Sequence, residues 1–507
     1  MVSFSLRQRI FSAPPAFPSP VSFHLSQFAA VCFLIPLFLA ICLNAGVKKY
    51  DFVVIGGGSA GYAGARTAAA LGLKTAVVEG AGELGGLCIL RGCMPSKALL
   101  ESAGRYRAIC NAAEFGLSVE KPGFDASRII ARKRRLIAEF VKYRSGQIQD
   151  GRFDLLRGAA IVTGPNSLQV AAPDGSQLPL EAKAMLIASG SAPSTPALPG
   201  LAGAGFLTSD DLLDRESIPE SLIVLGGGPV ALEMASYCQA FGSRVTVIQR
   251  SPQILRGTDR DAADALADGL RHHGMEIFTG TKILRIEKTA GARRVVFAHG
   301  GCELNVEASE ILNALGRTAV IPQGLEVDTC GGQVAVNLSM QTSVPTIFAA
   351  GDVCSPLEVV HVAIQQGEVA ARNAARLLAG DAGPLETMDY RLKLFAAFTE
   401  PGFACVGAGE EELSAAGIPF RTAKYPFDDH GKSIVMGKTK GFVKLTADAR
   451  SGEILGASIV GPEAAELIHE IVVAMRFHAT AADLAATPHY HPTLSEIWTY
   501  PAEELAG

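Results

Sequence analysis

Cysteine and surplus positive charge are both scarce in this 507-residue chain. Ten cysteines are too few for a disulfide-stapled scaffold, so we predict a cytoplasmic folded body in which a persistent disulfide is catalytic. The 45 Lys and Arg residues are outnumbered by 50 Asp and Glu residues, and the net charge of −5 offers no basic surface to nucleic acid. Hydrophobic residues make up 48% and charged residues 19%, which predicts a well-cored globular protein of about three domains.

Acidic residues are absent from the first 49 positions, which also contain an apolar segment at residues 28–47. This segment is at the lower limit for a membrane span, and Pro36 lies within it. Small residues near Ala45 would suit cleavage of an export signal. Three interpretations of residues 1–48 stay open: a loosely ordered extension or over-called start, a membrane anchor on a cytoplasmic body, and a cleaved targeting peptide.

An internal repeat predicts two dinucleotide-binding units. In the first unit an apolar strand at residues 51–55 runs into a glycine-rich turn, and a second strand ends on Glu79. The glycines of the turn are Gly56, Gly58 and Gly61. They allow the backbone to approach a pyrophosphate, whose charge the following helix N-terminus stabilises. Strand, turn, helix and second strand together are the context that makes this fingerprint specific.

The second unit begins about 170 residues later, with a strand at residues 221–225 and a turn containing Gly226 and Gly228. Its second strand is predicted to end on Gln249. The interval from the first glycine to the end of the second strand is 23 residues in both units. Two such units predict two bound dinucleotides.

The residues at the two strand ends predict different dinucleotides. Glu79 can accept hydrogen bonds from both ribose hydroxyls of an adenosine, as FAD presents. Gln249 carries no charge that would repel a 2′-phosphate, and Arg250 and Arg256 follow it as forked phosphate donors. We therefore expect NADPH in the second unit. The alternative is that the arginines belong to a solvated loop edge and that NADH is used.

Cys88 and Cys93 form a pair with four residues between them. On a regular helix they would lie about 7.5 Å apart along the axis, beyond the reach of a disulfide. Gly92 and Pro95 predict a bend followed by a helix start, where the helix dipole favours a thiolate. The pattern indicates a redox-active pair; two buried structural cysteines are the alternative.

These motifs together resemble those of the class I pyridine nucleotide-disulfide oxidoreductases, over residues 49 to 507. Four further segments strengthen the resemblance. They are ASGSAP with Gly190, ALGR with Gly316, VPTIFAAGDV with Asp352, and HYHPTLSE with His491 and Glu496. The first two segments resemble the family's crossovers between domains. The third implies that Asp352 binds the ribityl chain of FAD.

The resemblance implies roles for residues around the thiols. Cys93 resembles the flavin-proximal thiol, and Cys88 the interchange thiol that forms a mixed disulfide with substrate. Lys97 matches the family lysine near the flavin, and Glu233 matches the acid that pairs with it. Arg91, in an unusual inter-cysteine loop, is expected either to steer an anionic disulfide or stabilise a thiolate, or to be simply solvent-exposed.

The resemblance also implies an acid-base pair near the C-terminus. His491 would carry the proton of the leaving thiol, and Glu496 would orient its imidazole. In the family this pair serves the cysteines of the partner subunit, which implies a homodimer with shared active sites. His489 is expected to be an ordinary surface histidine.

We therefore predict an α/β fold with two Rossmann-like dinucleotide-binding domains and a C-terminal α+β dimerisation domain. The expected divisions are an extension at 1–48, an FAD domain at 49–195 and 318–384, an NAD(P) domain at 196–317, and an interface domain at 385–507.

The predicted activity is electron exchange between NAD(P)H, FAD, the Cys88–Cys93 disulfide and a small-molecule or lipoyl-type disulfide. A dihydrolipoamide dehydrogenase-like enzyme is the nearest match. Alternatives are a glutathione-disulfide-type reductase and a mercuric-reductase-like enzyme, although the chain carries no C-terminal cysteine pair to deliver a metal. A flavin redox sensor without turnover is a remote alternative, and no resident metal is expected.

Overall fold

The computed structural model describes residues 46–354 and 356–507, so the predicted extension lies, up to residue 45, outside the described part of the chain. Almost all of the proposed membrane anchor at residues 28–47 therefore lies outside the described residues. Within the described ranges no helix combines the length and apolar character needed to cross a bilayer.

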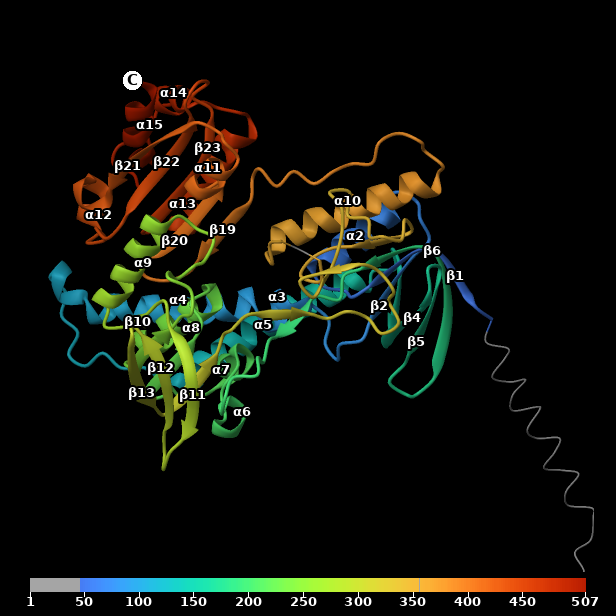
Figure 1. Ribbon diagram of the computed structural model, residues 1–507, viewed down its shortest axis with the longest axis horizontal. Helices are drawn as coiled ribbons and strands as arrows, with labels where there is room; N and C mark the ends of the chain where they lie inside the picture. The colour runs from blue at the N-terminus through green and yellow to red at the C-terminus, as the bar shows by residue number, and fades with distance from the viewer. Residues whose placement is uncertain (1–45, 355) are drawn as a thin grey trace, which may run out of the picture. The chain divides into compact units, whose positions relative to one another are not determined.

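The first dinucleotide-binding unit is built on a seven-stranded sheet of order β3-β2-β1-β6-β5-β4, with β18 also paired to β6 (Figure 1). The strands are β1 (Lys48–Ile55), β2 (Thr75–Glu79), β3 (Asp154–Arg157), β4 (Ala159–Gly164), β5 (Ser167–Ala171), β6 (Gln177–Ile187) and β18 (Ile347–Ala349). β1 runs parallel to β2 and β6, and every residue of β2 is buried. Burial on both faces explains the apolar runs at residues 52–55 of β1 and 184–187 of β6.

Helices α2 (Ser59–Ala70) and α10 (Val360–Leu378) pack closely beside this sheet. A Cβ atom on Gly367 would lie 2.2 Å from the carbonyl oxygen of Ala60, so only glycine permits this approach. A second group of helices follows β2. They are α3 (Gly86–Leu90), α4 (Cys93–Cys110), η1 (Ala112–Phe115) and α5 (Ala126–Ile148).

The second unit has a parallel sheet of order β10-β9-β8-β14 and an antiparallel sheet of order β11-β12-β13. The strands are β8 (Ser221–Leu225), β9 (Arg244–Ile248), β10 (Glu276–Phe278), β11 (Lys282–Lys288), β12 (Arg293–His299), β13 (Cys302–Ala308) and β14 (Glu310–Asn313). The helices are α6 (Leu201–Ala204), α7 (Ser209–Asp214), α8 (Pro229–Ala240) and α9 (Arg260–His272). β9 ends one residue before Gln249, the predicted strand end.

The chain passes between these units through an antiparallel ribbon of β7 (Ser191–Pro193) and β15 (Arg317–Ala319). A small ribbon of β16 (Thr329–Cys330) and β17 (Gln333–Val334) follows. The two predicted crossover segments therefore pair with each other.

The third unit is a five-stranded antiparallel sheet of order β19-β20-β23-β22-β21. Its strands are β19 (Leu394–Ala397), β20 (Gly402–Gly407), β21 (Phe420–Pro426), β22 (Phe442–Asp448) and β23 (Ile454–Gly461). Its helices are α11 (Glu410–Ala415), η2 (Phe427–Asp429), α12 (Gly431–Val435), α13 (Ala464–Arg476), α14 (Ala481–Ala486), η3 (Ser495–Trp498) and α15 (Thr499–Ala506). The predicted α/β fold class, with two dinucleotide-binding units and a C-terminal unit, is confirmed.

A lysine cluster ties the third unit to the second. The ammonium group of Lys444 on β22 lies 2.6 Å from Asp259, 2.9 Å from Asp261 and 2.9 Å from Glu410, and its side chain is 1% exposed. Asp259 and Asp261 stand at the start of α9. Burial would raise the pKa of Asp261, but hydrogen bonds from Lys424 and Lys444 lower it below its ordinary value.

Replacing Lys444 by Met should reduce the free energy of unfolding at pH 7 by about 3 kcal/mol, because the carboxylates lose their shared buried cation. Lys424→Met is the matched control: its ammonium also binds Asp261 but is 44% exposed, so its loss should cost under about 1 kcal/mol. Because the pKa of Asp261 is depressed in the folded state, the difference between the two losses of unfolding free energy should shrink below pH ~4. Urea unfolding measures both effects; equal losses in the two variants would contradict the cluster's importance.

Candidate active site

The two cysteines of the predicted redox pair lie on consecutive helices separated by a bend. Cys88 belongs to α3, and α4 begins at Cys93 after the cap residue Gly92. A Cβ atom at Gly92 would lie 3.0 Å from the carbonyl oxygen of Leu87 and 3.2 Å from the Cα of Cys88. Glycine thus allows the second cysteine to fold back on the first. Both thiols are unbridged in this structure.

The environment places the negative charge of the dithiol on Cys93. A hydrogen bond from the Cys88 thiol lowers the pKa of Cys93 to about 7; burial opposes this shift, and the charge of Lys97 assists it. The same hydrogen bond and burial strongly raise the pKa of Cys88. The first proton is therefore lost from Cys93 rather than from Cys88.

Lys97 and Glu233 form an ion pair between the first two units. The Lys97 ammonium on α4 lies 2.9 and 2.8 Å from the two carboxylate oxygens of Glu233 on α8. The Glu233 side chain is only 5% exposed and also accepts a hydrogen bond of 3.1 Å from the backbone N–H of Phe398. The Lys97 ammonium lies 4.5 Å from the centre of the Phe398 ring. The structure thus brings together the two residues that the sequence paired.

The first glycine-rich turn fits a dinucleotide. Gly56 adopts φ +103°, and a Cβ atom on Gly61 would lie 1.8 Å from the carbonyl oxygen of Gly56. No side chain caps α2 at Gly58, which leaves the helix N-terminus to a pyrophosphate. Glu79 is buried and accepts 2.8 Å hydrogen bonds from the N–H groups of Gly57 and Ala81. Its carboxylate keeps further acceptor positions for ribose hydroxyls.

The crossover ribbon brings Asp352 to the same unit. The hydroxyl of Ser191 donates to Asp352 at 2.7 Å and accepts from Arg317 at 2.7 Å. A Cβ atom added to Gly190 or Gly316, each in the left-handed region, would meet nothing within 4 Å. The Ser191 hydroxyl therefore joins Asp352 to the crossover ribbon, beside two glycines whose surroundings are open.

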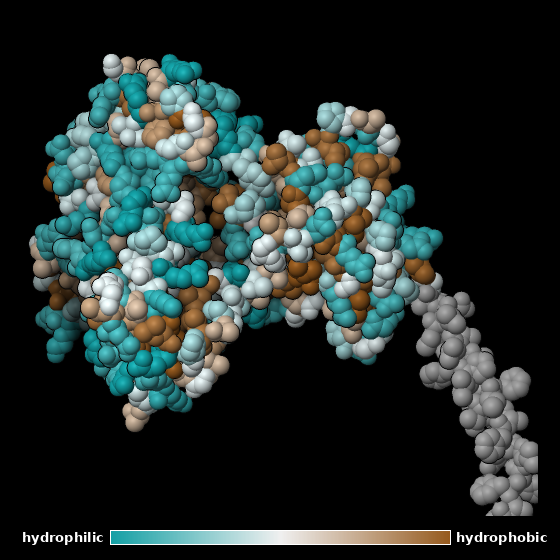
Figure 2. All heavy atoms as spheres, in the orientation of Figure 1, coloured by the Kyte–Doolittle hydropathy of each residue, from teal (hydrophilic) through white to brown (hydrophobic). Residues whose placement is uncertain are grey.

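The second unit lines a cavity of ≈ 730 Å³ that also receives residues from the first and third units. Gly228, Gln249, Arg256 and Gly316 line it. Figure 2 shows the visible face hollowed between the first unit and the other two. Gly226 adopts φ +114°, as Gly56 does in the first unit. The cavity fits a nicotinamide dinucleotide.

Arg250 and Arg256, the predicted 2′-phosphate donors, are both exposed. Within the described chain neither guanidinium group makes an ion pair or hydrogen bond. Gln249 makes one weak contact, from its amide nitrogen to the carbonyl of Gln253 at 3.4 Å. The Arg91 side chain is 57% exposed and lies 3.9 Å from Glu83 and 3.9 Å from Asp210.

The third unit positions the predicted acid-base pair. Nδ1 of His491 lies 2.9 Å from a carboxylate oxygen of Glu496, whose side chain is 10% exposed, while His491 is 80% exposed. The expectation that His489 is an ordinary surface histidine was wrong: its side chain is 8% exposed and pairs with Glu470. The described part of a single chain records no contact between His491 and either Cys88 or Cys93.

Gln366, a fully buried residue of α10, was not predicted from the sequence. Its side-chain oxygen accepts a hydrogen bond of 2.8 Å from the N–H of Gly351, directly before Asp352, and its amide donates to Tyr390 at 2.9 Å. Gln366 therefore holds the loop that carries Asp352. A polar residue on the mostly apolar buried face of α10, which also carries Asn373, was the available signal.

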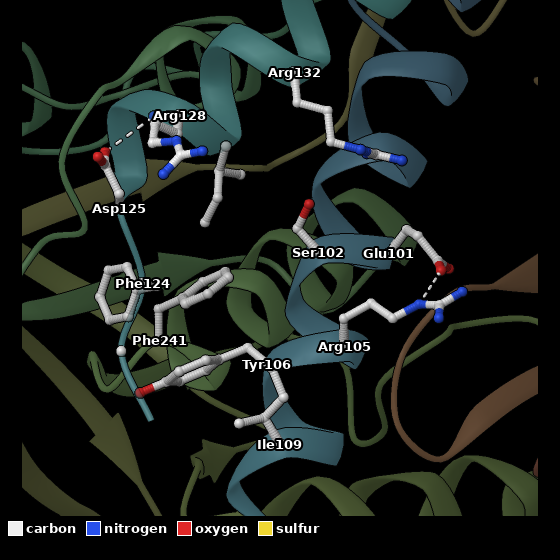
Figure 3. Close-up of a pocket in the computed structure, with 12 residues that line it drawn as sticks. Glu101, Ser102, Arg105, Tyr106, Ile109, Phe124, Asp125, Arg128, Arg132 and Phe241 are labelled. Atoms are coloured by element: carbon white, nitrogen blue, oxygen red, sulfur yellow. Dashed lines mark hydrogen bonds and ion pairs between the residues drawn. The ribbon is translucent and has the colours of Figure 1, made fainter. Parts of the chain in front are cut away.

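A second hollow, of ≈ 630 Å³, lies between α4 and α5 and contains none of the predicted site residues (Figure 3). Tyr106, Phe124 and Phe241 pack against one another at ring distances of 4.7–5.4 Å. Arg105 is paired with Glu101, and their dashed contact lies at the edge of the view. The larger cavity at the second unit is thus the candidate for cofactor binding.

Comparison with known proteins identifies the family. Residues 50–367 match the pyridine nucleotide-disulphide oxidoreductase family, and residues 395–502 match its dimerisation domain. The chain is 36% identical to a dihydrolipoyl dehydrogenase of Thermus scotoductus, with 90% of this chain and 98% of the relative aligned. A dihydrolipoyl dehydrogenase of Bacillus subtilis is 35% identical, with 88% and 96% aligned.

The chain belongs to the pyridine nucleotide-disulphide oxidoreductase family. The predicted family and enzyme class are confirmed: this is an FAD-dependent oxidoreductase that uses a nicotinamide dinucleotide and acts on a disulfide. Its C-terminal unit is the family's dimerisation domain.

Two solved structures share this fold. LpdA from Mycobacterium tuberculosis matches with a TM-score of 0.79 and 27% identity, over 90% of this chain and 100% of that one. A copper(II) complex of the HOCl-induced flavoprotein disulfide reductase RclA from Escherichia coli gives a TM-score of 0.78 and 26% identity, over 90% and 100%. In the described part of this chain no group of three or more His, Cys, Asp or Glu residues is placed to hold a metal ion.

Proposed function

We propose that this oxidoreductase acts on a dihydrolipoyl-type dithiol through Cys88 and Cys93. The observation that carries the proposal is the bend at Gly92, which folds Cys93 at the start of α4 back on Cys88 of α3, with the charge of Lys97 favouring a thiolate at Cys93. The dihydrolipoyl dehydrogenases among the relatives support a lipoyl-type substrate. FAD, when bound, supplies two-electron exchange between the thiol pair and the nicotinamide dinucleotide.

The domain roles follow from the same assignment. We assign FAD binding to residues 49–195 and 318–384, through the turn at Gly56, Gly58 and Gly61, the acid Glu79, and Asp352. Nicotinamide dinucleotide binding is assigned to residues 196–317, and dimer formation to residues 385–507. The catalytic body is assigned to the cytoplasm, where the reduced cofactor is available.

The thiol chemistry proceeds by two exchanges. One substrate thiolate attacks the Cys88 sulfur of the Cys88–Cys93 disulfide, which forms a substrate–Cys88 bond and releases Cys93 as a thiolate. The second substrate thiolate attacks the substrate sulfur of this mixed disulfide, which closes the substrate disulfide and releases Cys88. His491 takes the proton of each attacking substrate thiol: the first proton passes to solvent, and the second is returned to Cys88 as it leaves, while Glu496 orients the imidazole.

His491 is assigned to the cysteines of the partner subunit, since the described chain places it on the dimerisation domain without contact to its own thiols. Subunits carrying Cys88→Ser and subunits carrying His491→Ala would each be inactive. Activity should appear when they exchange into heterodimers, which contain one intact site; verified heterodimers without activity would contradict the shared site.

The substrate proposal predicts rapid oxidation of dihydrolipoamide by the holoenzyme and little activity with glutathione disulfide or Hg(II). Cys88→Ser should abolish turnover because the mixed disulfide cannot form. His491→Ala should lower turnover by about 10²–10⁴-fold, the usual contribution of general acid-base catalysis. Steady-state assays of all three substrates provide the measurement. A larger kcat/KM for glutathione disulfide or Hg(II) would overturn the substrate assignment.

The free, exposed arginines predict a preference for the phosphorylated nucleotide. Arg250 and Arg256 can each add a charge-assisted hydrogen bond to the 2′-phosphate, worth about 1.5–3 kcal/mol in favourable geometry. Solvent screening reduces this to an expected preference of tens to hundreds of fold for NADP(H). Replacing Gln249 by Glu and both arginines by Ala should turn the preference toward NAD(H). A wild-type kcat/KM ratio near one would mean that the arginines remain in solvent.

A further inference from the structure

A second histidine lies on the far side of Glu496 from His491. His430 caps the start of α12 and is completely buried, at 0% exposure. Its Nε2 atom lies 3.4 Å from Oε1 of Glu496, and the other carboxylate oxygen, Oε2, lies 2.9 Å from Nδ1 of His491. Nδ1 of His430 lies 2.8 Å from the hydroxyl oxygen of Ser433. Ser433, His430, Glu496 and His491 therefore form a continuous row of polar groups.

The neighbours in this row indicate which ring nitrogen of His430 carries the proton. Burial lowers the pKa of His430, and the nearby Glu496 only partly opposes this, so the imidazole is neutral at pH 7. A neutral ring has one donor and one acceptor. We assign the Nε2–H tautomer, in which the Ser433 hydroxyl donates to Nδ1 and the ring N–H faces Glu496. Nε2 is buried and makes no hydrogen bond in the described chain, and the Glu496 carboxylate oxygen 3.4 Å away is the acceptor that could satisfy it.

Few other polar or charged side chains lie close to the carboxylate of Glu496. Tyr500 of α15 faces His430 with its ring centre 6.4 Å away, and it stacks on Tyr425 at 3.9 Å. The Tyr425 hydroxyl is bound to Asp429 rather than to Glu496. Within the described residues no lysine or arginine pairs with Glu496. The two histidines are the side chains that contact its carboxylate oxygens.

We propose that His430 is a positioning residue of the acid-base site, which keeps Glu496 aimed at His491 by offering its Nε2–H to the opposite carboxylate oxygen, Oε1. This proposal rests on the acid-base role of His491 given above. His430 touches neither substrate nor cofactor and acts only through Glu496. Sharing the carboxylate charge between two donors makes Oε2 a weaker acceptor, and so sets the basicity of the His491 imidazole.

The test measures the His491 imidazole directly, without turnover. Diethyl pyrocarbonate modifies neutral imidazoles, and mass spectrometry of the peptide that contains His491 reports its modification rate against pH in the holoenzyme. His430→Met removes the donor at similar volume, and His430→Gln retains an N–H in nearly the same place. We expect the apparent pKa of His491 to rise by about half a unit or more in His430→Met and to stay near the wild-type value in His430→Gln.

Turnover provides the second readout. His430→Met should lower kcat by about tenfold with an unchanged KM, while His430→Gln should retain most of the activity. An unchanged His491 titration in a folded His430→Met enzyme, or an equal shift in both variants, would overturn the proposal. Failure of the proposed function is distinguishable: His491→Ala would then retain full turnover, whatever the titration of His491 shows. If His430→Met does not fold, a normal His491 titration and normal kcat in Glu496→Gln would overturn the proposal instead.

Discussion

The ion pair between Lys97 and Glu233 is the interaction on which the rest of the site depends. It joins α4, which carries Cys93, to α8 of the second dinucleotide unit. Glu233 also binds the backbone of Phe398, next to β19 of the third unit. One carboxylate thus fixes three parts of the fold at the place where electrons must pass. Because Glu233 is almost fully buried, loss of either partner would leave an uncompensated charge.

The same pair controls the chemistry of the thiols. Lys97 favours the Cys93 thiolate, whereas Glu233 opposes it, so the pair limits how far the pKa of Cys93 falls. Cys88 makes the larger contribution by donating its hydrogen bond to Cys93. A thiolate that is stabilised too strongly is a poor nucleophile and a good leaving group. The arrangement suits Cys93 for release from a disulfide and leaves Cys88 to meet the substrate.

Much of this arrangement could be predicted from sequence, because it depends on local patterns. The strand, turn and helix around Gly56 and Gly226 follow from short motifs, and the bend at Gly92 follows from the cysteine spacing. The pairing of Lys97 with Glu233, 136 residues apart, came only from the family resemblance. Other long-range partners had no motif. The fully buried Gln366 and the cluster around Lys444 become visible only when distant segments pack together.

His489 shows why residue type alone misleads. Two histidines separated by one residue have opposite surroundings: His489 is nearly buried against Glu470, while His491 is mostly exposed. Exposure is decided by the packing of α13 and the segment before η3, which no local pattern encodes. His430 was missed for the same reason, since its partner Glu496 lies 66 positions later in the chain.

The most direct test of this account is the pKa of the Cys93 thiol in the reduced holoenzyme, measured by the pH dependence of alkylation at Cys93 in peptide maps. The wild type should titrate at about 7. Lys97→Met should raise this value, Glu233→Gln should lower it, and the double variant should fall between them, because the two charges act on Cys93 with opposite sign. A Cys93 pKa that neither substitution moves would contradict the control of the thiolate by the ion pair.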